Sequence, residues 1–242
     1  MPSRQQLRRA ARGAIPWPIR QRLYDRDGGR KRRWRLAPGV ERLADERLAA
    51  LTFDDGPGGK DTRAVLDALS AAEAPATFFV LGEHVLEQPD LVREIRDRGH
   101  ELALHGMTHR RHDRLEEGEA EEELRRGMAA IEEVGGQRPR WYRPPFGRSS
   151  PLLASICKRL ELTLVYWTAW GHDWEPVPSS HVAGTVLRDL GPGGIALLHD
   201  SARYGQRGDV RATADAVPQI ATAARGSGLT LVTLSGALNG ER

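Results

Sequence analysis

Cysteine is almost absent from this sequence, since Cys157 is the only one among 242 residues. A single cysteine excludes an internal disulfide framework, and a chain of this length can bury a full hydrophobic core without one. No apolar run approaches the roughly 18 residues that a membrane-spanning helix needs. Internal repeats and low-complexity segments are also missing. The sequence therefore predicts one large globular domain rather than a disordered chain or a disulfide-rich module.

Positive charge is concentrated in the first 40 residues, which hold twelve Arg or Lys against Asp25 and Asp27. The whole chain has 36 basic and 33 acidic side chains, so the remainder has 24 and 31. A segment of charge +10 therefore precedes a body of charge −7. Because the basic character belongs to this segment, the net charge of +3 does not predict a specific nucleic-acid partner. We expect residues 1–48 to form a basic N-terminal extension and residues 49–242 to form the main domain.

Two interpretations of the basic extension remain open. It could dock on an anionic membrane or an acidic polymer, or it could wrap the body through Ile15, Trp17 and Leu23. The second is favoured, because a polybasic stretch alone is weak evidence. No apolar stretch of about 7–15 residues follows the basic start, so no secretory signal is evident. We expect a cytoplasmic protein or one peripheral on the inner face of the membrane; a truncated start would instead allow an extracytoplasmic location.

Short apolar runs alternate with longer amphipathic ones after residue 48, which predicts a parallel β/α architecture of seven strands. The expected strands are Leu48–Phe53, Ala76–Leu81, Glu101–Leu104, Arg140–Arg143, Thr163–Trp167, Gly194–Leu198 and Thr230–Leu234. The expected helices are Thr62–Ala72, Gln88–Arg98, Glu117–Val134, Pro151–Leu160, Ser180–Leu190 and Val210–Arg225. Six acids crowd into Glu116–Glu123, and we interpret them as the solvated face of a helix rather than a metal site.

Ionisable side chains gather where the predicted strands end, which is the edge where β/α barrels place their chemistry. Five of the seven strand ends carry them, whereas the strand interiors carry almost none. This pattern predicts one converging site. Its members are Asp54 and Asp55 after the first strand, His105 and His109 after the third, Arg143 after the fourth, Asp173 after the fifth, and His199 with Asp200 after the sixth.

Asp55, His105 and His109 form a ligand set typical of catalytic zinc. The two histidines are four residues apart, so a helical turn would place both imidazoles on one side. Gly106 excludes the zinc-protease motif, which needs Glu directly after the first His. Adjacent strand residues point in different directions, so Asp54 would remain free to accept a proton. Alone, the Asp-Asp-Gly-Pro sequence would be an ordinary turn.

His199 follows an apolar run and could serve as a general acid if a carboxylate orients it. Asp173 is the candidate for that carboxylate, and Asp200 is the local competitor. Arg143 would pair with Asp54 and keep that carboxylate ionised by lowering its pKa.

Five motifs in this order resemble the polysaccharide deacetylase family with the NodB homology domain, also called carbohydrate esterase family 4. The resemblance implies a distorted (β/α)7 barrel and one divalent metal ion, usually Zn²⁺, with Co²⁺ or Ni²⁺ also possible. It implies removal of N-acetyl groups from an N-acetylated amino sugar or polysaccharide, with release of acetate. The motifs are Thr52–Pro57, His105–His109, Arg143–Phe146, Asp173-Trp174 and Leu197–His199.

The resemblance also implies a role for each matching residue. One aspartate would act as base and His199 as acid, each tuned by a charged neighbour, while three side chains hold the metal. Carried over by position, these are Asp54 as base with Arg143, His199 as acid with Asp173, Asp55, His105 and His109 as metal ligands, Phe146 as a backbone N–H donor to the oxyanion, and Trp174 and Leu197 as walls of the acetyl pocket.

Two departures from the family pattern leave the substrate open. Trp170 stands where relatives often have Asp, and Gly106 stands where they frequently have Ser or Thr. The same metal site could act on an O-acetyl ester, a formamide or another non-sugar amide, and a non-enzymatic binding module is a weaker alternative. We expect a monomer whose partner is an N-acetylated carbohydrate.

Some of the four tryptophans near the fourth and fifth strands could line a sugar subsite, although two or more could equally be core. These are Trp141, Trp167, Trp170 and Trp174.

Overall fold

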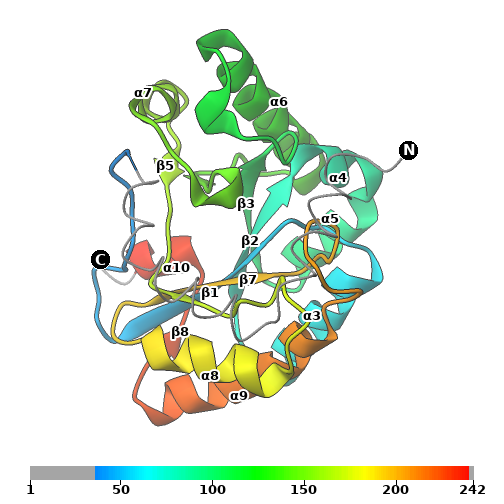
Figure 1. Ribbon diagram of the computed structural model, residues 1–242, viewed down its shortest axis with the longest axis vertical. Helices are drawn as coiled ribbons and strands as arrows, with labels where there is room; N and C mark the ends of the chain where they lie inside the picture. The colour runs from blue at the N-terminus through cyan, green and yellow to red at the C-terminus, as the bar shows by residue number, and fades with distance from the viewer. Residues whose placement is uncertain (1–35, 240–242) are drawn as a thin grey trace.

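Short parallel strands form one curled sheet in the computed structural model, which describes residues 36–239 (Figure 1). The strand order is β5-β4-β3-β2-β1-β7-β6, and β8 pairs with the start of β1. The predicted distorted barrel of β/α units is confirmed, and it is open between β5 and β6. The strands are β1 Leu48–Asp54, β2 Ala76–Leu81, β3 Glu101–Gly106, β4 Trp141–Tyr142, β5 Thr163–Leu164, β6 Ala169–Trp170, β7 Ile195–His199 and β8 Thr230–Leu231.

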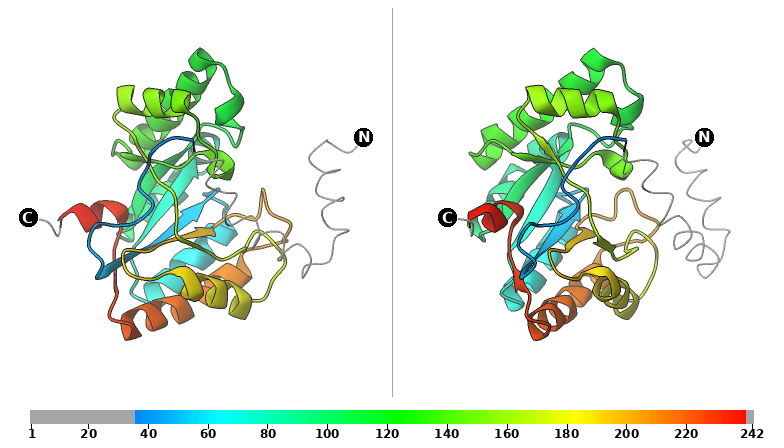
Figure 2. Two further views of the ribbon diagram at one scale, coloured as in Figure 1. Left: turned by 60° about the vertical axis from the view of Figure 1, so that its left-hand side comes forward. Right: turned by 90° about the vertical axis from the view of Figure 1, so that its left-hand side faces the viewer.

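Helices cover the outer face of this sheet (Figures 1 and 2). In Figure 1, α8 and α9 lie together along the lower side, and α6 and α7 lie at the top. The α-helices are α3 Lys60–Ala71, α4 Gly82–Glu87, α5 Pro89–Asp97, α6 Glu117–Gly135, α7 Pro151–Arg159, α8 Ser179–Asp189, α9 Arg211–Gly226 and α10 Leu234–Asn239, with short 3₁₀ turns η2 His112–Arg114 and η3 Pro145–Gly147. In the part of the chain described, no helix is long and apolar enough to cross a membrane.

Alternation along β1 separates the two hydrophobic cores. Leu51 and Phe53 point outward into the large core between sheet and helices, whereas Ala50 points into the small core inside the barrel. Thr52 and Asp54 share the inner face with Ala50 because side chains alternate about a strand. The inner face of the barrel is therefore polar at the carboxyl end of β1 and apolar around Ala50.

The prediction of one strand over Thr163–Trp167 is wrong, because the chain forms two short strands, β5 and β6. The break between them distorts the barrel. The chain pairs with β4 only as far as Leu164, crosses the barrel opening and resumes as β6 beside β7. β5 and β6 thus form the opposite edges of the sheet, and no described strand pairing joins them. Val40 bridges Val165 in this gap, and the Tyr166 N–H donates to the Val40 carbonyl at 2.8 Å.

Residues 36–47 of the predicted extension lie against the body rather than away from it. Ala37 is buried, and its carbonyl accepts a hydrogen bond from the Tyr166 hydroxyl at 2.9 Å. The proposed contacts of Ile15, Trp17 and Leu23 lie outside the described residues. Two further helices, α4 and α10, were not predicted, because six residues are too few to show a clear helical period.

Candidate active site and metal centre

Asp55, His105 and His109 come together at the carboxyl ends of β1 and β3, as their positions after predicted strands indicated. Their ligand atoms all lie within 4.8 Å of one another. Asp55 Oδ1 is 3.3 Å from His105 Nε2 and 3.2 Å from His109 Nε2. The predicted helical turn between the histidines is wrong, since His105 ends a strand and His109 lies in the irregular bend after it. Gly106, with φ of 117°, makes that bend possible.

The donor set of this triad fits a divalent cation. His105 Nδ1 lies 2.7 Å from the Arg143 carbonyl oxygen, which can only accept, so Nδ1 carries a proton and, in the neutral imidazole, Nε2 has a free lone pair. This lone pair faces Asp55 Oδ1, a buried atom with no hydrogen-bond partner among the described residues. Electron pairs that face each other in a buried site repel unless a cation lies between them. One carboxylate and two imidazoles suit zinc.

Asp54 is held by a buried arginine. Arg143 Nη1 donates to Asp54 Oδ1 at 2.7 Å and to the Thr52 hydroxyl at 2.8 Å, and its Nη2 donates to the Tyr166 carbonyl at 3.0 Å. The guanidinium is fully buried and lies 4.1 Å from the centre of the Phe79 ring. Burial lowers the pKa of Arg143, and Asp54 opposes that shift. The pair fixes one carboxylate oxygen of Asp54 inside the barrel mouth.

His199 lies on the strand next to Asp54 and pairs with Asp173. Asp54 and His199 are directly opposite in the β1–β7 register. His199 Nδ1 is 2.8 Å from Asp173 Oδ1, and the His199 backbone N–H donates to Asp173 Oδ2 at 2.9 Å. Burial lowers the pKa of His199, but Asp173 outweighs it and raises that pKa to about 9; the pKa of Asp173, which burial alone would raise, falls to about 2 beside His199. Nε2 is left to face the site.

Asp173, and not Asp200, is therefore the carboxylate that orients His199. Asp200 turns away from His199, and its Oδ2 accepts from the Thr62 hydroxyl at 2.6 Å. It packs so closely on Gly56 that a Cβ there would lie 2.1 Å from Asp200 Oδ2. Burial raises the pKa of Asp200 to about 7. Asp200 therefore supports the turn that follows Asp54 and Asp55.

Arg207 and Thr213 belong to this site, although no sequence pattern singled them out. The Thr213 hydroxyl donates to Asp173 Oδ2 at 2.7 Å, and Arg207 Nη1 lies 3.4 Å from the same oxygen. Arg207 Nη2 also donates to the His199 carbonyl at 2.9 Å. Their contacts with Asp173 join residues 34 and 40 positions apart, which leaves no local sequence signal.

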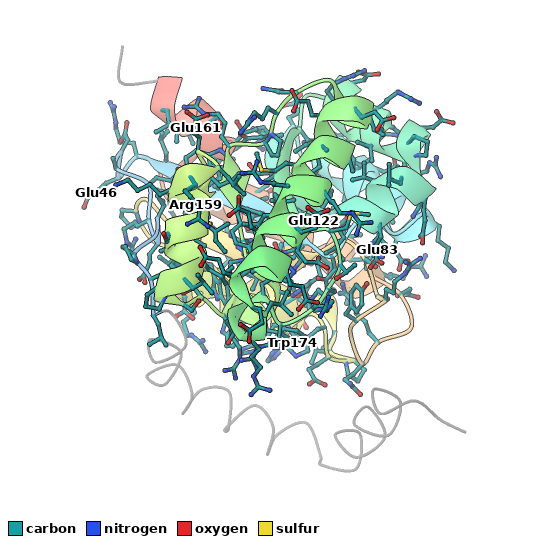
Figure 3. All side chains as sticks on the ribbon, turned by 90° about the horizontal axis from the view of Figure 1, so that it is seen from above. Glu46, Glu83, Glu122, Arg159, Glu161 and Trp174 are labelled. Carbon is teal, nitrogen blue, oxygen red and sulfur yellow. The ribbon has the colours of Figure 1, made fainter. Side chains whose placement is uncertain are left out.

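Aromatic rings surround the metal-binding triad and His199. His109 stacks on Tyr204, with ring centres 4.1 Å apart, and meets the edge of Phe146 at 4.6 Å. Trp174 meets His199 edge-on at 5.7 Å, and Leu197 shares the inner face of β7 with His199. Figure 3 shows Trp174 at the margin of the molecule. Phe146, Trp174 and Leu197 are therefore near the site, while their pocket roles remain predictions. Tyr204, which stacks on His109, was not predicted from the sequence as a site residue.

The four tryptophans divide into two groups. Trp167, Trp170 and Trp174 form a chain of rings, with centres 6.2 and 5.0 Å apart, that leads to His199. Trp141 is buried at the opposite end of the barrel, where its indole N–H donates to Glu101 at 2.9 Å. Trp141 is therefore core, and it cannot reach a substrate at the site.

The matching family model is described as polysaccharide deacetylase and covers residues 42–165. The chain belongs to the polysaccharide deacetylase family. A chitooligosaccharide deacetylase from a Bradyrhizobium strain is 36% identical over 165 residues, which are 68% of this chain and 75% of that protein. A peptidoglycan-N-acetylglucosamine deacetylase from Bacillus cereus is 30% identical and overlaps 72% of this chain, which spans 63% of that relative.

Solved structures agree with this assignment. The family 4 carbohydrate esterase from Streptomyces lividans, solved with acetate, matches with a TM-score of 0.70 and 34% identity. The match covers 78% of this chain and 93% of that one. The predicted class of enzyme, a deacetylase among the hydrolases, is therefore confirmed.

Proposed function

We propose that this protein hydrolyses the N-acetyl group of an N-acetylated amino sugar, releasing acetate and a free amine. The observation that carries the proposal is the pairing on neighbouring strands of Asp54 with Arg143 and of His199 with Asp173, beside the Asp55, His105 and His109 triad. The names of the relatives, a chitooligosaccharide deacetylase and a peptidoglycan-N-acetylglucosamine deacetylase, support an N-acetylglucosamine-containing substrate.

Asp55, His105 and His109 would hold the metal ion, with Zn²⁺ the best match and Co²⁺ or Ni²⁺ acceptable to the same ligands. When bound, the ion would supply Lewis-acid chemistry, acidifying water and polarising the amide carbonyl. Asp54 would take a proton from the attacking water, because Arg143 donates to only one of its carboxylate oxygens.

His199 would donate a proton to the departing amine from Nε2, since Nδ1 is committed to Asp173. Asp173 keeps the imidazolium protonated near neutral pH by raising the pKa of His199. The Phe146 backbone N–H would stabilise the tetrahedral oxyanion, and Trp174 with Leu197 would enclose the acetyl methyl group. The net reaction consumes water and the amide and gives acetate and the protonated amine, so atoms and charge balance.

Acetate release from N-acetylglucosamine oligomers tests the proposal, using enzyme stripped by a chelator and resupplied with Zn²⁺, Co²⁺ or Ni²⁺. Asp54→Asn should lower turnover by about 10²–10⁴-fold, the range of general acid–base catalysis, while zinc still binds. Asp55→Asn should lose both zinc and activity. Asp90→Asn, whose carboxylate is 92% exposed, is the matched control and should be unchanged. Full turnover by Asp54→Asn would overturn the mechanism.

A metal-loaded enzyme that releases no acetate from any oligomer would instead favour formamides, acetyl esters or other amides as substrates. The monomeric state, the cytoplasmic or membrane-peripheral location and the contact of the basic extension with an anionic surface remain predictions. Residues 1–35 of the extension lie outside the described residues.

A further inference from the structure

The bend that carries His109 is anchored to a single carboxylate on α6. Thr108 precedes His109, and its backbone N–H donates to Glu123 Oε2 at 2.9 Å. The Thr108 hydroxyl lies 3.1 and 3.0 Å from the two oxygens of the same carboxylate. The Met107 N–H donates to the Glu123 backbone carbonyl at 3.1 Å. Two consecutive residues between the histidine ligands are thus bonded to one residue of a helix.

Glu123 differs from the other acids of its cluster, so the interpretation of Glu116–Glu123 as a wholly solvated face is wrong at this position. Its side chain is only 9% exposed, whereas the neighbouring Glu122 is exposed (Figure 3). Burial raises the pKa of Glu123, but hydrogen bonds from His112 and Thr108 outweigh it and leave the pKa lowered. A buried carboxylate is costly unless it is paired, which indicates that this one has a specific task.

His112 completes the anchor. Its Nε2 lies 3.2 Å from the Thr108 carbonyl oxygen, which can only accept, so Nε2 carries a proton; it is also 3.5 Å from Glu123 Oε2. Its Nδ1 is 2.7 Å from the hydroxyl of the buried Tyr142. The ring lies so close to Gly106 that a Cβ added there would meet His112 Cε1 at 2.2 Å. His112 therefore fills the space inside the bend that joins the two histidine ligands.

We propose that Glu123 and His112 are positioning residues that hold His109 at ligand distance from Asp55. The inference rests on the proposed function only in assuming that the triad binds a metal. Among the described residues, no hydrogen bond or ion pair joins either side chain to Asp55, so each would act through the bend. Residues that orient metal ligands through hydrogen bonds typically alter metal affinity by about 10–100-fold when removed.

Zinc affinity, measured by competition with a chromophoric chelator on the full chain, tests this proposal without any substrate. Glu123→Ala should weaken zinc binding by about 10–100-fold. Glu123→Gln retains an acceptor for the Thr108 N–H and should recover part of that loss. Glu122→Ala, the adjacent exposed acid on the same helix, is the matched control and should bind zinc as the unmodified chain does.

If Glu123→Ala fails to fold, as judged by thermal unfolding in the presence of chelator, Thr108→Val decides the question. It keeps the shape and the backbone N–H but removes one hydrogen bond, and should weaken zinc binding by about two- to tenfold. Folded variants that bind zinc as tightly as the Glu122→Ala control would overturn the inference while leaving the proposed function intact. Tight zinc binding without acetate release would count against the proposed function alone.

Discussion

The acid side of the site depends on one residue pair, Asp173 and His199. Burial alone would leave His199 neutral near pH 7, because desolvation disfavours the charged imidazolium. Asp173 reverses this, raises the pKa of His199 to about 9 and is itself supported by Thr213 and Arg207. His199 therefore remains protonated across the neutral pH range, and Asp173 rather than the imidazole alone sets its pKa.

Asp173→Asn should move the basic limb of the pH profile of kcat to lower pH. With the carboxylate charge gone, burial dominates and the pKa of His199 falls, so less imidazolium remains at pH 8. We expect at least a tenfold loss of kcat there and a smaller loss at pH 6. Acetate release measured from pH 5.5 to 9.5 tests this. A variant with the same pH limb as the unmodified enzyme would show that Asp173 does not tune His199.

At the scale of the element, the bend after β3 shows how backbone geometry and packing act together. Gly106 has φ of 117°, and the ring of His112 occupies the position that a side chain would need. A glycine at this position therefore has a local physical reason, because the His112 ring takes the space. This chain fastens the bend with Glu123, Thr108 and His112.

Gly106→Ala should destabilise the fold more than Gly99→Ala does. Gly99 also has a positive φ, of 82°, but a Cβ there meets nothing within 4 Å. Gly99→Ala should therefore cost only the backbone strain, about 1–2 kcal/mol. Gly106→Ala carries a similar strain and must also displace His112. Urea unfolding of both variants measures the difference, and equal losses of unfolding free energy would show that the contact with His112 carries no cost.

The surface of α6 also joins neighbouring elements. Arg159 of α7 reaches Glu121 of α6 at 2.6 Å and Glu117 at 2.9 Å, and Figure 3 shows the two helices side by side. These pairs are exposed and screened by solvent, so they add little to stability. The acids on this helix thus serve two environments, with Glu123 turned toward the site and its neighbours turned toward water or α7.

At the scale of the whole molecule, the barrel brings the site together from strands that are far apart in the chain. The register places Asp54 between Phe79 of β2 and His199 of β7, so base and acid are neighbours although 145 residues separate them. The gap between β5 and β6 leaves the barrel open on one side, with Val40 lying in that gap.

Zinc should stabilise the whole domain, because it would bind only the folded chain, in which the ends of two strands bring its three ligands together. Free zinc at 100 times its Kd would add about 2.7 kcal/mol. For a chain of this size that corresponds to a rise in Tm of roughly 5–10 °C. Thermal unfolding with zinc and with chelator measures the shift. Asp55→Asn should abolish the shift, and a shift that persists in this variant would place the zinc at another site.

The residues of the candidate site could be predicted from the sequence because each stands at the end of a strand whose apolar run is visible on its own. Asp54, Asp55, His105, Arg143 and His199 all follow such runs, and parallel strands deliver their ends to one edge. Strand and helix alternation likewise predicted the fold, since periodicity is a local property.

Only the tertiary structure decided which partners these residues take and where the barrel stays open. Asp173 rather than Asp200 orients His199, Glu123 turns inward from an acidic helix, and Arg207 reaches the site from a loop without any motif. The break after Leu164 likewise has no local signal, because the chain leaves β4 to pair with β7. Each of these outcomes depends on contacts between distant residues, and burial rather than residue type determines which charges must be paired.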